Sequence, residues 1–230
     1  MKKNKVCDII ILDNGILVPI LKNGASNMSD TTSKQRIILA SASPRRREIL
    51  SFMGIDFTVI CADADESSNI TDPATLTQEL ARRKGQAVYS LLAERGEADG
   101  AIIISADTVV SVNGEILGKP RDRADAEQML RKLSGNRHSV ITGVAVTVNG
   151  KTYTDRSETF VFVDDITDEG IERYVNSGDP FDKAGAYGIQ GSFSRWIRGI
   201  EGCYFGVVGL PVNCLARLLE RATGLSVEQL

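Results

Sequence analysis

An uninterrupted apolar run at residues 101–105 constrains the fold more than any other feature of this sequence. It reads Ala-Ile-Ile-Ile-Ser, and a short continuous run of this kind is typical of a strand buried on both faces. Residues 36–40 form a second apolar strand pattern, and a helix is expected to begin at Ser43-Pro44, because Ser can cap a helix and Pro suits its first turn. Alternating strands and helices predict an α/β fold with a mixed, twisted central sheet flanked by helices.

The other expected elements follow from local patterns. Apolar residues at helical spacing predict a helix over residues 73–93, and a strand fits residues 57–61. Asn113-Gly114 and Asn149-Gly150 predict hairpins within residues 109–117 and 139–163. Further helices are expected over residues 123–133, 167–176 and 211–222, and the Gly-rich residues 178–209 are expected to form loops and short strands.

Residues 1–34 are expected to be an accessory extension before one domain at residues 35–230. Asp13-Asn14-Gly15 predicts a hairpin turn within residues 7–21, and polar residues follow. Asp8 and the same turn interrupt the apolar stretch well short of a signal sequence, and no run approaches membrane-spanning length. We therefore expect a cytoplasmic protein with no membrane partner.

Composition excludes two further classes of protein. The net charge of −3 and the pI near 5.4 argue against binding to nucleic acid, which needs an excess of Lys and Arg. The four cysteines are scattered, with neither zinc-ligand spacing nor the density of a disulfide scaffold, so they are expected to be reduced.

The segment Ser41 to Arg47 is the first candidate for a phosphate site. It reads Ser-Ala-Ser-Pro-Arg-Arg-Arg where a strand gives way to a helix. Free backbone N–H groups and the hydroxyls of Ser41 and Ser43 would there accompany Arg45 and Arg46, an arrangement that suits an anion. The alternative is a capped helix with a solvated basic first turn, although the helix dipole disfavours cations at that end.

Carboxylates occur after two of the expected strands. Asp107 follows the buried run at residues 101–105, at the sheet edge where α/β folds build their sites, so it could act as a base or a metal ligand. A turn-forming or capping role is the alternative. Asp63, Asp65 and Glu66 offer hard oxygen ligands of the kind that Mg²⁺ or Mn²⁺ prefers, although an acidic loop is usually only solvated.

Several single residues complete the list of candidates. Lys119, in Gly-Lys-Pro after a hairpin, is a compact charge suited to phosphate, whereas Lys84 on a helix could be merely solvated. Gln190 lies in the Gly-rich segment 182–191, and its amide could pair with the N3–H and O4 edge of uracil or thymine. His138, the only histidine, has no nucleophile at triad spacing and is expected to be packed.

Taken in order, these motifs resemble the Maf family of nucleoside triphosphate pyrophosphatases, once described as septum formation inhibitors. The resemblance covers residues from about 36 to 219. It is carried by Leu39-Ala40-Ser41-Ala42-Ser43-Pro44-Arg45-Arg46, Asp63-Ala64-Asp65-Glu66, Ala106-Asp107-Thr108-Val109-Val110, Gly118-Lys119-Pro120, Leu133-Ser134-Gly135, residues 182–191 and Val207-Val208-Gly209-Leu210-Pro211.

The resemblance implies two lobes around a deep cleft, hydrolysis between the α and β phosphates, possible removal of noncanonical nucleotides, and dependence on a divalent cation such as Mg²⁺ or Mn²⁺. It implies that Asp107 accepts the proton of the attacking water and binds metal with Glu66. The residues that it implies hold the triphosphate are Ser41, Ser43, Arg45, Arg46, Lys84 and Lys119. A nucleoside triphosphate is the expected partner, and a homodimer is a further possibility.

The Ala-Asp-Thr form around Asp107 resembles the branch of the family that acts on dTTP and UTP, with Arg45, Thr108 and Gln190 at the matching specificity positions. The 7-methyl-GTP branch, which has Ser-Asp-Gln there, and a nucleotide-binding regulator of cell division are the alternatives. The chain departs from the family pattern at Asp179, where Glu is commoner, and at Gly206, where Asn is frequent.

Overall fold

The computed structural model describes residues 10–11, 17–18 and 35–230. β1 (Ile10–Ile11) and β2 (Leu17–Val18) pair antiparallel, as the expected hairpin requires. The turn expected at residues 13–15, the remainder of the extension and Cys7 lie outside the described residues.

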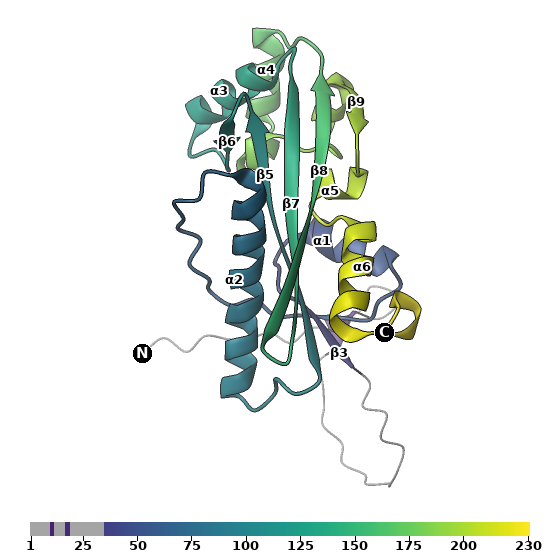
Figure 1. The fold of residues 1–230 in the computed structure, drawn as a ribbon. Coiled ribbons are helices and arrows are strands. Elements are labelled where there is room, and N and C mark those ends of the chain that lie inside the picture. The colour runs from purple at the N-terminus through teal and green to yellow at the C-terminus, as the bar shows by residue number, and fades with distance from the viewer. Residues whose placement is uncertain (1–9, 12–16, 19–34) are drawn as a thin grey trace, which may run out of the picture.

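The core of the fold is a seven-stranded sheet with the order β4-β3-β5-β7-β8-β9, in which β6 also pairs with β5. β3 runs parallel to β4 and β5, and the other neighbours are antiparallel, which confirms the mixed sheet. Its strands are β3 (Arg36–Leu39), β4 (Thr58–Val59), β5 (Ala101–Val112), β6 (Glu115–Leu117), β7 (Arg137–Val148), β8 (Lys151–Val163) and β9 (Ile197–Glu201). β5, β7 and β8 are long and twist strongly along their length (Figure 1).

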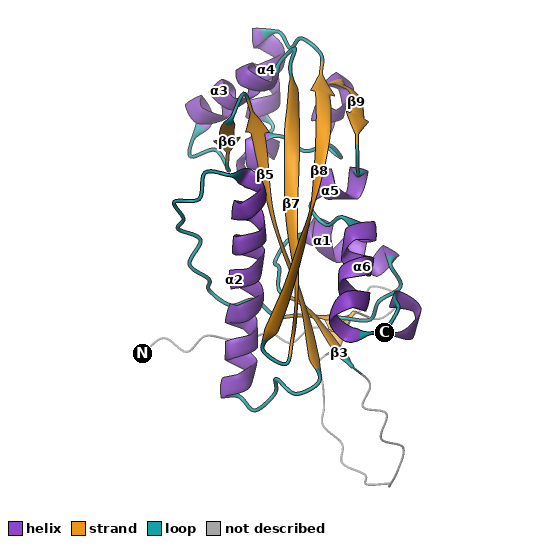
Figure 2. Cartoon of the chain, in the orientation of Figure 1, coloured by secondary structure: helices purple, strands orange, loops and turns teal. Residues whose placement is uncertain are grey.

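Helices cover both sides of this sheet (Figure 2). Six α-helices and four 3₁₀ segments lie in the described part of the chain. They are α1 (Pro44–Phe52), α2 (Pro73–Glu94), α3 (Arg123–Leu133), α4 (Asp168–Asn176), α5 (Tyr204–Val208), α6 (Val212–Thr223), η1 (Asp179–Asp182), η2 (Ala184–Ala186), η3 (Ser192–Trp196) and η4 (Val227–Gln229). None of the helices in the described residues combines the length and apolarity needed to span a bilayer.

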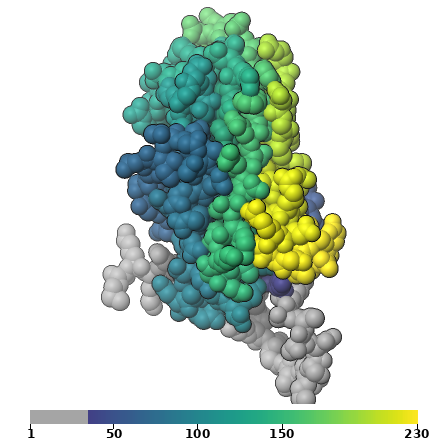
Figure 3. Space-filling view, viewed as in Figure 1, coloured from purple at the N-terminus to yellow at the C-terminus, as the bar shows by residue number. Residues whose placement is uncertain are grey.

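Side chains alternate between the two faces of the sheet along each strand, and this alternation determines which helix each residue contacts. On β5, Ile102 and Ile104 belong to the apolar cluster formed with α1 and α6, whereas Ile103 belongs to the cluster formed with α2. Successive side chains of a strand point to opposite faces, so Asp107 shares the α2 face with Ile103. In Figure 3 the blue α2 and the yellow C-terminal segment flank the green strands.

α2 lies unusually close to the sheet because glycines remove side chains at two contacts. A Cβ on Gly143 of β7 would lie 2.4 Å from the backbone carbonyl carbon of Thr77. A Cβ on Gly85 of α2 would lie 2.9 Å from Ser105 Oγ, and that hydroxyl donates a hydrogen bond of 2.7 Å to the carbonyl of Ala81. The close approach brings Lys84, the residue before Gly85 on α2, within reach of Asp107 on β5.

The structure corrects two expectations about secondary structure. The strand expected at residues 101–105 continues to Val112, so Asp107 lies within β5, opposite Gly143, and not at the sheet edge. The reason is that β7 pairs with the whole of residues 102–111, a nonlocal contact that a local apolar pattern does not reveal. In the Gly-rich region expected to hold only loops and short strands, residues 204–208 form the helix α5.

Candidate active site

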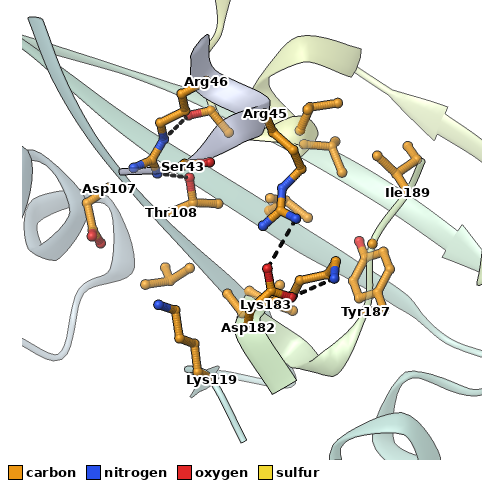
Figure 4. A pocket seen from close by; sticks show the side chains of 18 of the residues that line it. Ser43, Arg45, Arg46, Asp107, Thr108, Lys119, Asp182, Lys183, Tyr187 and Ile189 are labelled. Carbon is orange, nitrogen blue, oxygen red and sulfur yellow. Dashed lines mark hydrogen bonds and ion pairs between the residues drawn. The ribbon is translucent and has the colours of Figure 1, made fainter. Parts of the chain in front are cut away.

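A cavity of about 700 Å³ lies between the N-terminus of α1, the middle of β5 and the loop that contains η1 and η2 (Figure 4). Nine of the ten residues proposed from the sequence line it: Ser43, Arg45, Arg46, Glu66, Lys84, Asp107, Thr108, Lys119 and Gln190. The tenth, Ser41, is buried behind them and contacts Arg46. Asp107 therefore shares one cavity with Arg45 and Lys119, as residues that act on one ligand must.

Asp107 and Glu66 meet at the ammonium of Lys84. Lys84 Nζ lies 2.6 Å from Asp107 Oδ1 and 3.2 Å from Glu66 Oε1. Asp107 is only 8% exposed, so its carboxylate has little access to solvent and is oriented by this ion pair. Lys84, which could have been a solvated helical lysine, instead connects α2 to both acidic residues.

Arg46 is held by neutral oxygens from three separate segments. Its Nε donates to the carbonyl of Gly209 at 2.7 Å, and its two terminal nitrogens donate to Ser41 Oγ at 3.3 Å and Thr108 Oγ1 at 3.1 Å. Gly209 has a φ of 123°, a conformation that favours glycine and aims this carbonyl at the guanidinium. Burial lowers the pKa of Arg46, and the negative charge of Asp107 raises it in part. An arginine stays protonated under such a shift.

The N-terminus of α1 differs in one detail from the expected cap. Ser43 occupies the N-cap position, but its side chain makes no capping hydrogen bond. Its backbone N–H instead donates to Ser41 Oγ at 3.3 Å. The Ser43 side chain lines the cavity beside Arg45, so the hydroxyl and the helix N-terminus both face the space where an anion would bind.

The loop of η1 and η2 contributes three charged residues that the sequence analysis did not propose as site residues. Lys183 Nζ lies 2.9 Å from Asp179 Oδ1 and 2.6 Å from Asp182 Oδ1. Asp182 Oδ2 reaches across the cavity to Arg45, at 3.4 Å from one terminal guanidinium nitrogen (Figure 4). Burial raises the pKa of Asp182, but the hydrogen bond and charge of Lys183, with the charge of Arg45, outweigh it and lower the pKa overall.

Asp179 is held more firmly than Asp182. It accepts a hydrogen bond of 2.6 Å from the hydroxyl of Tyr174, which in turn accepts the backbone N–H of Gly188 at 3.3 Å. Burial raises the pKa of Asp179, but Tyr174 and Lys183 outweigh that effect and lower it overall. Asp179, one of the two residues at which the chain departs from the family pattern, is thus linked through Tyr174 to the loop that leads to Gln190.

His138 is packed, as expected, and supports one wall of the cavity. Its Nε2 lies 2.7 Å from the hydroxyl of Tyr187, and Tyr187 lines the cavity next to Ile189 (Figure 4). The Tyr187 ring also packs on Phe193, at 4.7 Å between ring centroids. Burial lowers the pKa of His138 to about 4, so the ring is neutral near pH 7. An apolar, rigid wall of this kind suits a nucleobase.

Other residues considered from the sequence lie elsewhere. Asp65 accepts hydrogen bonds from Ser67, and neither Asp63 nor Asp65 lines the cavity. Conversely, Glu48, Asp179 and Lys183 do line it. Asp179 and Lys183 are four residues apart, a spacing at which opposite charges pair on a helix. This spacing was the signal in the sequence that could have identified Asp179 and Lys183.

Comparison of the sequence with known proteins finds a family and several related enzymes. Residues 36–222 match the family described as Maf-like proteins. The chain is 48% identical over 190 residues to a dTTP/UTP pyrophosphatase of Chromobacterium violaceum, covering 82% of this chain and 96% of the relative. It is 46% identical over 188 residues to one of Symbiobacterium thermophilum (81% and 94%) and 48% identical over 190 residues to one of Alkaliphilus metalliredigens (81% and 96%).

Proposed function

The chain belongs to the Maf family, and we propose that it is a nucleoside triphosphate pyrophosphatase that converts dTTP and UTP to the monophosphate and pyrophosphate. The observation that carries the proposal is the shared cavity, in which a little-exposed carboxylate, Asp107, lies among basic side chains. The dTTP/UTP pyrophosphatases that are 46–48% identical to this chain support the choice of reaction and substrates.

Asp107 is the general base in this proposal. Water attacks the α-phosphorus in line with the leaving pyrophosphate, and the Asp107 carboxylate takes the proton of that water. Its attachment to the middle of a paired strand supports the assignment, because β5 and the Lys84 contact fix the direction of the carboxylate. A base held on a rigid element loses little conformational freedom when the reaction occurs.

The phosphates are proposed to bind Ser43, Arg45, Arg46, Lys84 and Lys119. Arg46 has donors left after its three hydrogen bonds, because a guanidinium carries five N–H groups. Ser41 is proposed to act through Arg46, which it contacts, since it does not line the cavity. Positive charge placed before the reaction stabilises the negative charge that develops on pyrophosphate.

A divalent cation fits these residues only in part. Glu66 and Asp107 both direct a carboxylate oxygen at the same position. The ammonium of Lys84 already occupies that position. Among the described residues no group of three or more His, Cys, Asp or Glu side chains could hold a metal ion. Mg²⁺ or Mn²⁺ would therefore be held by these two carboxylates together with substrate phosphates and water, and it would neutralise phosphate charge.

Base selection is proposed to depend on Arg45, Thr108 and Gln190, beside the wall formed by Tyr187. All four residues line the cavity. The Gln190 amide offers a donor and an acceptor to the N3–H and O4 edge of uracil or thymine. Because free nucleotides are the substrates, we propose that the protein acts in the cytoplasm without nucleic acid or a membrane as partner. A homodimer remains a prediction.

A substrate panel tests the proposal. Purified protein is incubated with Mg²⁺ or Mn²⁺ and each of dTTP, UTP, dCTP, GTP, ATP and 7-methyl-GTP, and pyrophosphate is measured. We expect release of pyrophosphate from dTTP and UTP at a kcat/KM at least about tenfold above the others, which corresponds to about 1.4 kcal/mol. Binding without product would favour a nucleotide-sensing regulator, and preference for 7-methyl-GTP would assign the other branch.

A further inference from the structure

The charged side chains that line the cavity sum to a formal charge of about zero. Five of the side chains that line it are cationic and five are acidic. A triphosphate carries several negative charges, so it cannot bind simply by adding to a surplus of positive charge. Its binding is therefore strengthened if some of these cations leave the carboxylates that hold them.

The cations differ in how they are held. Arg46 bonds to neutral oxygens, and the Lys119 side chain has no ion pair or hydrogen bond within the described residues. Lys84 is held by the proposed base and by Glu66. In the described part of the chain, Asp182 is the acidic partner of Arg45, at 3.4 Å. Arg45 is therefore the phosphate-binding candidate whose release depends on a residue outside the proposed catalytic group.

Asp182 is suited to releasing Arg45. Its side chain is 64% exposed, compared with 32% for Asp179 on the same 3₁₀ segment. Asp179 is held by a hydrogen bond from Tyr174, whereas within the described residues Asp182 contacts only the cationic groups of Arg45 and Lys183. A half-exposed ion pair of this kind contributes little energy, so an incoming phosphate can replace it.

We propose that Asp182 is an affinity-determining residue that competes with phosphate for Arg45. Without nucleotide its carboxylate holds the Arg45 guanidinium across the cavity, and a triphosphate displaces it to bind Arg45. After hydrolysis the carboxylate returns to Arg45 and promotes release of pyrophosphate. The inference rests on the proposed function, because it takes the cavity to be the triphosphate site.

Titration of the full chain with inorganic pyrophosphate in EDTA tests this proposal without turnover. Asp182→Asn removes the competing charge and should bind pyrophosphate about three- to fivefold more tightly than wild type, the range expected for an exposed ion pair. Glu48→Gln is the matched control, since it removes one negative charge from the same cavity but its side chain has no hydrogen bond or ion pair within the described residues. The control should bind within about twofold of wild type.

A double mutant separates competition for Arg45 from a general charge effect. In an Arg45→Ala background, Asp182→Asn should change pyrophosphate affinity by less than about twofold. The proposal is overturned if Asp182→Asn binds no tighter than wild type, if Glu48→Gln gains as much, if the gain persists without Arg45, or if no variant binds pyrophosphate. Thermal melting checks the fold of each variant, and Asp182→Ser provides a second removal of the charge. If Asp182→Asn binds pyrophosphate more tightly as expected but the wild-type protein releases no pyrophosphate in the substrate panel, the proposed function is wrong and the competition for Arg45 stands.

Discussion

Asp107 and Thr108 are consecutive on β5, yet their side chains bind two different helices. Asp107 pairs with Lys84 on α2 at 2.6 Å, and Thr108 accepts a hydrogen bond of 3.1 Å from Arg46 on α1. Because neighbouring residues of a strand point to opposite faces, this dipeptide connects the two helices that cover the sheet. Both side chains nevertheless line the same cavity, so the strand places the proposed base and a proposed specificity residue side by side.

Asp107→Asn should remove most turnover while leaving nucleotide binding measurable. The amide keeps the shape of the side chain but cannot accept the proton, so kcat should fall by about 10²- to 10⁴-fold. Pyrophosphate release measures kcat, and calorimetric titration with dTTP in EDTA measures binding. Near-normal turnover by this variant would exclude Asp107 as the base.

Lys84→Met should make the nucleotide-free protein bind Mn²⁺ more tightly. The ammonium lies within 3.2 Å of both Glu66 and Asp107 and so opposes a second cation there. Its removal should raise Mn²⁺ affinity at least about tenfold, as expected for loss of a like charge a few ångströms away. Electron paramagnetic resonance of free Mn²⁺ measures the affinity. Lys119→Met removes a cavity lysine that has no ion pair with either carboxylate in the described part of the chain, and it should leave the Mn²⁺ affinity unchanged. Equal gains in both variants would contradict the expectation.

Gly143→Ala should destabilise the protein by forcing α2 away from the sheet. The new methyl group would lie 2.4 Å from the backbone of Thr77, and backbone cannot move aside as a side chain can. We expect a loss of about 1–3 kcal/mol in the free energy of unfolding, measured by urea denaturation, together with reduced turnover because Lys84 moves with the helix. Gly199→Ala on β9 is the control, since a Cβ there has no neighbour within 4 Å. A neutral effect at Gly143 would refute the close approach.

Local sequence predicted most elements because their signals are local. The helix expected at residues 123–133 has those bounds, and the two hairpins turn at Asn113-Gly114 and Asn149-Gly150, where each Asn has a positive φ. The length of β5 could not be predicted in this way. Ala106, Asp107 and Thr108 join the strand because they pair with β7, some thirty-five residues later in the chain.

The same distinction applies to the cavity. Local motifs, together with the family resemblance, identified nine residues that line it, on the strand β5, on the helices α1 and α2 and in the loops between elements. The contact between Arg45 and Asp182 joins residues 137 positions apart, and no local pattern indicates which carboxylate an arginine will meet. Asp179 was noticed only as a departure from the family pattern, and its bond to Tyr174 needed the fold to be seen.

His138 should make the stability of the protein depend on pH in a range where few other groups titrate. Burial lowers its folded-state pKa from 6.5 to about 4, and its Nδ1 has no hydrogen-bond partner among the described residues, so a proton there would be unsatisfied. Between these two values the unfolded chain binds the proton and the folded chain does not. The contribution to stability is therefore complete above pH 6.5 and is lost as the pH falls toward 4.

The expected loss between pH 7 and pH 5 is about 2 kcal/mol in the free energy of unfolding, measured by urea denaturation at each pH. Because the chain contains one histidine, His138→Gln should abolish most of this loss while keeping a side chain that can bond to Tyr187. Carboxylates with lowered pKa, such as Glu79 at about 2, lose their contribution only at lower pH, below their unfolded values near 4.5. A wild-type protein equally stable at pH 7 and pH 5, or a variant with the same loss, would show that His138 is not the group responsible.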